Sequence, residues 1–132
     1  MTENGLITLP SAHGAKAAAD RLAAEIAAKG MTVFARIDHA AGAKEVGMAL
    51  RPTEVLIFGN AKGGTPLMQT KQTIGIDLPL KALVWEDADG KVWLSYNDPG
   101  WIAQRHGATG VTEVTGRLAA ALAALAKTAT GA

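Results

Sequence analysis

The chain contains no cysteine, and this absence excludes disulfide bonds, thiol nucleophiles and cysteine-ligated metals together. Histidine is also scarce, because His13, His39 and His106 are the only three and lack the spacing of a local metal site. Ser11 and Ser95 are the only serines, and neither lies in a Gly-x-Ser-x-Gly elbow. We therefore predict no bound metal, no cofactor and no serine triad.

A strong charge of either sign and a long apolar run are also lacking. Thirteen Lys and Arg residues nearly balance twelve Asp and Glu residues, so the formal net charge is +1. Nucleic-acid binding then has no broad basic field to support it. No apolar run approaches the roughly 20 residues of a membrane span, and Met1–Asn4 does not begin a signal peptide. We expect a cytoplasmic protein without nucleic-acid or membrane partners.

What the sequence does contain is enough apolar material for one core, since hydrophobic residues make up 48% of 132 positions. We predict a single domain over 1–132, with 128–132 as a frayed tail. Alternating apolar residues predict five strands, at 5–9, 31–37, 54–58, 80–86 and 91–96. Helical periodicity predicts helices between Ser11 and Gly30, over 40–50 and over 113–127, with short helices after Pro66 and Pro99. The order indicates an α+β fold, with a mainly antiparallel five-stranded curved sheet and the two longer Ala-rich helices on one face.

The two strands around Asp87–Gly90 form a hairpin by necessity. A four-residue loop would put one set of side chains on the core face: Leu83, Trp85, Val92, Leu94 and Tyr96. The other face would carry Ala82, Val84, Trp93 and Ser95. That face is too apolar to be freely solvated, so we expect a helix, a partner subunit or a ligand to cover it. Trp93 is the candidate interface residue, because aromatic residues are enriched at interfaces.

A glycine-rich segment follows the third strand and reads Phe58-Gly-Asn-Ala-Lys-Gly-Gly-Thr-Pro-Leu-Met68. Thr65 as N-cap and Pro66 as the first helical residue would open a helix there. Backbone N–H groups, a helix dipole and a lysine together favour an anion such as carboxylate, phosphate or sulfate. The candidate ligand-binding residues are Asn60, Lys62, Gly63, Gly64 and Thr65. The competing interpretation is a tight turn whose glycines only permit positive φ; the spacing of a Walker loop is absent.

Asp38 and His39 end the second strand and are weak candidates for a catalytic pair. Adjacent residues of a regular strand point to opposite faces, which argues against direct pairing. The competing interpretation is that one of them caps the next helix.

Four separate motifs resemble the DUF302 family of domains of unknown function: Gly59–Met68, Asp77–Lys81, Val84–Asp87 and Tyr96–Pro99. They cover nearly the whole chain in the family's order. The resemblance implies a TBP-like α+β domain, often homodimeric, and no established reaction. Two positions differ from the family pattern. Ala61 stands where the family usually has proline, and Leu80 stands where some relatives carry a cysteine, so a thiol mechanism is not carried over.

We therefore expect a homodimeric small-ligand-binding or interaction domain with an anion site in the segment 59–66. The alternatives are a small enzyme that uses Lys62, Asp38 and His39, and a structural partner in a larger complex. The enzyme requires these three side chains to converge on one pocket.

Overall fold

The computed structural model describes residues 4–132. Of the segment Met1–Asn4, for which no signal peptide was predicted, only Asn4 is among the described residues. The chain alternates strands and helices before a final antiparallel hairpin and two helices. In chain order, the elements are β1 (Leu6–Pro10), α1 (Ala15–Ala28), β2 (Thr32–Asp38), α2 (His39–Glu45), β3 (Thr53–Gly59), α3 (Ala61–Thr70), the 3₁₀-helix η1 (Gln72–Ile76), β4 (Leu80–Glu86), β5 (Val92–Asn97), α4 (Pro99–Arg105) and α5 (Thr112–Thr130).

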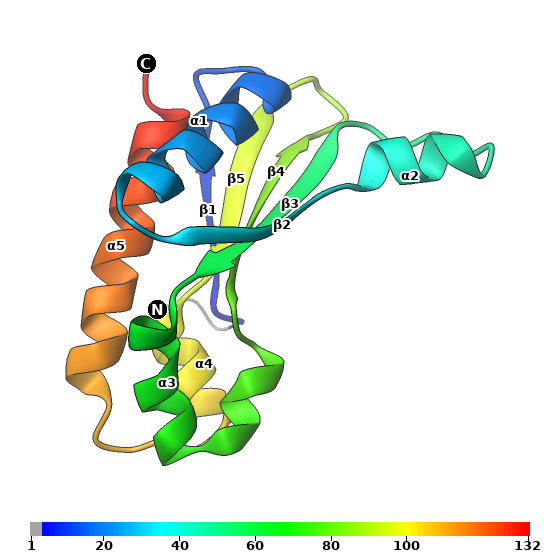
Figure 1. The fold of residues 1–132 in the computed structure, drawn as a ribbon. Coiled ribbons are helices and arrows are strands. Elements are labelled where there is room, and N and C mark those ends of the chain that lie inside the picture. The colour runs from blue at the N-terminus through cyan, green and yellow to red at the C-terminus, as the bar shows by residue number, and fades with distance from the viewer. Residues whose placement is uncertain (1–3) are drawn as a thin grey trace.

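The five strands form one sheet in the order β1-β5-β4-β3-β2, and every neighbouring pair is antiparallel. The two long helices, α1 and α5, pack against each other and against the sheet (Figure 1). Helices α3 and α4 lie together at one end of the sheet, beside the beginning of α5 (Figure 1). The predicted α+β fold with an antiparallel five-stranded sheet is confirmed.

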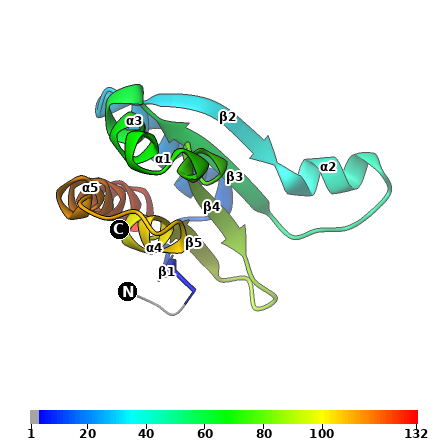
Figure 2. The ribbon, with the colours of Figure 1, turned by 90° about the horizontal axis from the view of Figure 1, so that it is seen from below.

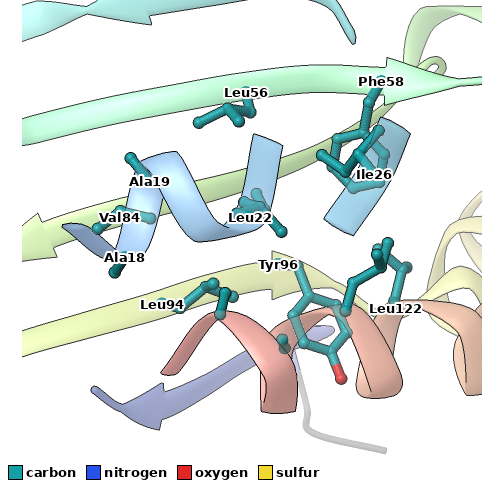
Figure 3. Close-up of a cluster of buried hydrophobic side chains, with 14 of the residues drawn as sticks. Ala18, Ala19, Leu22, Ile26, Leu56, Phe58, Val84, Leu94, Tyr96 and Leu122 are labelled. Carbon is teal, nitrogen blue, oxygen red and sulfur yellow. The ribbon is translucent and has the colours of Figure 1, made fainter. Parts of the chain in front are cut away.

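The main core lies between the sheet and the helix pair (Figure 3). Ala18 and Ala19 of α1 are fully buried, and their small side chains let the helix approach the strands closely. Leu22 and Ile26 continue the same stripe at helical spacing and are also buried. Phe58 at the end of β3 is the largest fully buried side chain. A second, smaller core around Leu67 and Ile74 joins α3, η1 and α4.

The register of the β4–β5 hairpin corrects the predicted core face. Trp85 pairs with Trp93 and Glu86 with Val92, so the loop holds five residues. The Asp87 carboxylate oxygen Oδ1 accepts N–H bonds from Asp89 (2.9 Å) and Lys91 (3.0 Å), which keeps Lys91 inside the turn. Compared with the predicted four-residue loop, the pairing is shifted by one residue, and such a shift moves the side chains of one strand to the opposite face of the sheet. The core face therefore carries Ala82, Val84, Val92, Leu94 and Tyr96.

The opposite sheet face holds both hairpin tryptophans. Their rings stack with centroids 6.3 Å apart. The Trp85 indole N–H donates to Ser95 Oγ (2.9 Å), and that of Trp93 donates to Asp87 Oδ2 (2.9 Å). Ser95 is only 4% exposed although it faces away from the helices. The residues for which we expected a cover are therefore divided: Ala82 and Val84 lie in the core under the helices, whereas Trp93 and Ser95 lie on this face with Trp85.

The C-terminal segment 128–132 is ordered by contacts, which corrects the predicted frayed tail. Helix α5 continues to Thr130, and both Ala129 and Thr130 are buried. The N–H of Ala12 donates to the Thr130 carbonyl (2.8 Å), and His13 Nε2 lies 2.6 Å from the Gly131 carbonyl oxygen. The helix end is therefore attached to the segment before α1.

The segment 39–52, which we call the arm, projects away from the sheet in both views (Figures 1 and 2). We predicted a helix over 40–50. Helix α2 instead ends at Glu45 and buries no residue. Val46, Met48 and Leu50 are exposed by 71%, 67% and 48%. Gly47, with φ of 76°, ends the helix early.

Candidate binding pocket beside the glycine-rich helix

Helix α3 begins at Ala61, five residues earlier than the predicted first helical residue Pro66, with Asn60 as its N-cap. The Asn60 side-chain oxygen accepts the N–H of Gly63 (2.8 Å). The backbone carbonyl oxygen of Asn60 accepts the N–H groups of Gly63 (3.2 Å) and Gly64 (3.3 Å). Asparagine is a better N-cap than threonine, and it overrides the Thr-Pro start that the sequence suggested. Pro66 then lies inside the helix, where it has no N–H to donate to the Lys62 carbonyl.

The two helical glycines serve close packing. A Cβ atom on Gly63 would lie 3.3 Å from Leu118 Cδ2, and one on Gly64 would lie 3.3 Å from Leu78 Cδ1. Neither glycine has positive φ, whereas Gly59 does, at 150°. The turn interpretation therefore applies to Gly59, and the other two glycines let α3 lie close to α5 and to Leu78.

A cavity of about 940 Å³ adjoins this helix start. It is lined by the end of α1 and the start of β2, the end of β3, the first turn of α3, the segment around Leu78 and one side of α5. Its deep wall includes Phe58, Leu80 and Leu118, of which the first two are buried. On α5, the small side chains of Ala121 and Ala124 line it. The walls are mostly apolar, and such a cavity is the usual form of a small-molecule site.

In the described part of the chain, the charged side chains that line the pocket are all basic: Lys29, Lys62 and Arg117. All three are exposed, so they lie at the rim. Lys29 pairs with Glu25 (3.7 Å) and Arg117 with Glu113 (3.4 Å), each one turn away along its own helix. Exposed pairs of this kind contribute little. Within residues 4–132, no salt bridge is found for Lys62.

The structure brings four of the five predicted binding residues to this pocket, namely Asn60, Lys62, Gly63 and Gly64. Thr65 is exposed and does not line it. Asp38 and His39 lie elsewhere, at the start of the arm. Asp38 Oδ1 accepts the N–H of Ala41 (2.9 Å) and thereby caps α2. The three side chains required for the enzyme alternative are therefore not gathered in this pocket.

Sequence reasoning missed an ionic cluster between η1 and α4. The Asp77 carboxylate accepts two bonds from Arg105 Nη1 (2.8 and 2.9 Å) and lies 2.6 Å from His106 Nε2. His106 Nδ1 lies 3.0 Å from Thr73 Oγ1. Burial is the largest single influence and opposes ionisation, but His106 and Arg105 together outweigh it and lower the pKa of Asp77. No sequence spacing links these residues, because Asp77 and His106 are 29 positions apart.

The cluster fastens η1 to the end of α4 and has no metal-binding geometry. Among residues 4–132, no group of three or more His, Asp or Glu side chains is placed to hold a metal ion. In the same part of the chain, no helix is both long and apolar enough to cross a membrane.

The chain belongs to the DUF302 family, a domain of unknown function, whose pattern matches residues 7–125. The fold is similar to the crystal structure of an uncharacterized conserved DUF302 protein from Bacillus stearothermophilus. That similarity has a TM-score of 0.84 at 17% sequence identity and covers 95% of this chain and 98% of the other. At this identity the match supports the fold alone.

Sequence relatives carry the name of a channel. The chain is 57% identical over 104 residues to fluoride-specific ion channel FluC 1 of Brucella suis and, equally, to FluC 1 of Brucella abortus. These matches cover 79% of this chain but only 41% and 38% of the two relatives. The chain thus spans about two fifths of the length of the curated relatives that it matches.

Proposed function

We propose that this domain binds a small anionic ligand in the pocket beside α3, with the negative group at Lys62. The observation that carries the proposal is the composition of the pocket lining: among residues 4–132 it has three basic side chains, no acidic one and mostly apolar walls. An anion at such a rim meets positive charge from three different elements. Because low-polarity walls screen charge less than water does, the attraction is stronger there than on an open surface.

The helix start adds backbone donors to this site. Asn60 already caps the N–H groups of Gly63 and Gly64, so these two amides are not the donors that the sequence suggested. The N–H groups of Ala61 and Lys62 come first in α3, where an α-helix offers no internal acceptor. Together with the helix dipole, they favour a negative group at this position.

Titration calorimetry and thermal shift against acetate, sulfate, phosphate and a nucleotide, at constant ionic strength, test the proposal. At least one of these anions should bind the native protein. Lys62→Ala should weaken it at least about tenfold, the effect of losing one charge-assisted hydrogen bond. Lys44→Ala, an exposed lysine on α2, is the matched control and should bind normally. Equal affinities of the two variants, or no binding beyond the effect of salt, would contradict the proposal.

We further propose that the domain works as a homodimer through the tryptophan face of the sheet. Trp85 and Trp93 lie there without a helix over them, and both are only half-buried. Ile37, on the same face of β2, is 41% exposed. A structural role in a larger complex would use the same surface.

A second candidate function follows from the Brucella relatives, namely an accessory domain of a fluoride channel. The observation that favours it is the 57% identity over 104 residues. The pocket itself does not suit fluoride, because a cavity of about 940 Å³ with apolar walls cannot replace the hydration of so small an ion. We therefore place the domain beside the transport step and assign it no part in conduction.

Fluoride efflux from vesicles tests this second candidate, using the full-length Brucella suis relative and a version without the matched segment. The accessory role predicts that both transport fluoride and that the rates differ at least twofold. Identical rates would contradict it. Loss of channel protein from the membrane is separated from loss of activity by measuring the amount inserted.

A further inference from the structure

We infer that the ligand of this pocket is an amphipathic monoanion, with one carboxylate head at the basic rim and a long apolar chain in the interior. This inference rests on the proposed anion site and adds the class of molecule. The proposed ligand is a long-chain carboxylate. Its single charge matches Lys62, the rim lysine for which no salt bridge is found among the described residues.

The charged side chains of the pocket all lie at its rim and its buried lining residues are apolar, although the exposed Phe34 also lies at the rim. Lys29, Lys62 and Arg117 are exposed at the rim. Phe58 is fully buried and Leu80 is 7% exposed, and both belong to the main core. A ligand that satisfies both regions must itself carry charge at one end and apolar surface at the other.

The cavity lies where the two cores meet. Leu78 and Leu118 line it, and each packs against both the main core and the smaller core. Apolar side chains at such a junction would normally close on each other. Here they border an open volume, and water in it would face mostly apolar atoms. Displacing that water by an alkyl chain is favourable.

Helix α5 makes room for the chain. Its core-facing stripe contains Leu122 and Leu125, which are each 2% exposed. The neighbouring positions that line the cavity are Ala120, Ala121 and Ala124. Larger side chains there would fill the space. Met31 and Met68 also line the cavity, and their flexible thioethers adapt to ligands of different shape.

The volume is much larger than an inorganic anion requires. At roughly 30 Å³ per water, about 940 Å³ corresponds to some tens of water molecules. A phosphate or sulfate would occupy a small part and leave the apolar walls wet. A nucleotide would need polar partners for its base and sugar, and the walls offer few.

Calorimetric titration with straight-chain carboxylates of increasing length, each below its micelle concentration, tests the inference. The affinity should rise about fourfold for each CH₂ group buried and level off when the chain fills the cavity. Primary alcohols of the same length should bind about tenfold more weakly, because they lack the charge. Lys62→Ala should remove this difference and keep the dependence on length.

A matched pair on α5 tests the cavity directly. Ala124 and Ala123 are both exposed, but only Ala124 lines the cavity. Ala124→Phe should abolish the gain from longer chains and leave acetate binding intact. Ala123→Phe should behave like the native protein, and far-UV circular dichroism checks that both variants fold.

The outcomes separate the two proposals. Binding of acetate or sulfate at Lys62 without any gain from chain length would overturn the amphiphile and leave the anion site standing. Primary alcohols that bind as tightly as carboxylates of equal length would overturn the charged head, and with it both proposals. Alkyl phosphates that bind more than tenfold tighter than carboxylates of equal length would overturn the assignment of a single-charge head. A native protein that binds none of these probes would overturn both.

Discussion

Asp77 shows how one side chain can join segments that the sequence keeps apart. It follows η1 and holds Arg105 and His106 at the end of α4. Arg105 is half exposed, whereas the side chains of Asp77 and His106 are 17% and 10% exposed. Because the contacts are partly shielded from water, they contribute more than a surface ion pair of the same geometry.

Replacing Asp77 by asparagine should lower stability at neutral pH by about 1–2 kcal/mol, because charged hydrogen bonds are lost. The pH dependence has a defined sign. The folded pKa of Asp77 is lowered, so its stabilisation is complete above the unfolded pKa near 3.9. It is lost as the pH falls through the lower folded pKa. Urea unfolding between pH 6 and pH 2 should therefore decline less steeply in acid for Asp77→Asn than for the native protein.

Asp89→Asn is the control for this measurement, since Asp89 lies exposed in the hairpin loop. It should follow the native curve at every pH. If Asp77→Asn also follows that curve, the cluster does not stabilise the fold.

At the scale of the elements, sequence patterns predicted which segments are strands and helices better than where those elements meet. The five strands and the two long helices all exist. The predicted core face of the hairpin was wrong because the loop length depends on hydrogen bonds that the Asp87 carboxylate accepts, which no periodicity reveals. The predicted start of α3 was wrong because Thr65-Pro66 has the sequence of a helix start but lies inside a helix whose N-cap is Asn60.

The candidate site was predictable in part for a similar reason. Asn60, Lys62, Gly63 and Gly64 were identified from one continuous segment, and all of them line the pocket. Lys29 and Arg117 were missed because α1 and α5 bring them to the rim from distant parts of the chain. The cavity itself depends on how α5 crosses the end of the sheet, which a single sequence does not specify.

At the scale of the whole molecule, two apolar surfaces are left without a partner within the described chain. One is the tryptophan face of the sheet. The other is the arm, where Val46, Met48 and Leu50 are exposed. A monomer rarely exposes several large apolar side chains together unless they contact something, so the surfaces make competing predictions about how two copies associate.

Light scattering at micromolar concentration should give twice the 13.6 kDa mass of the chain. Trp93→Lys should shift the mass to that of a monomer, because a charge would be buried against apolar groups of the partner. Ile76→Lys is the control, because Ile76 is 74% exposed on η1, away from the strands, and the dimer should persist.

Met48→Lys separates the two surfaces. A dimer that survives Trp93→Lys but dissociates in Met48→Lys would place the interface on the arm and contradict the tryptophan face. A monomeric mass for the native protein would contradict the homodimer itself. The Trp85 ring already donates to Ser95 within one chain and stacks on the Trp93 ring. If the native protein is a monomer, these contacts within the chain alone shield the open face of the sheet from water.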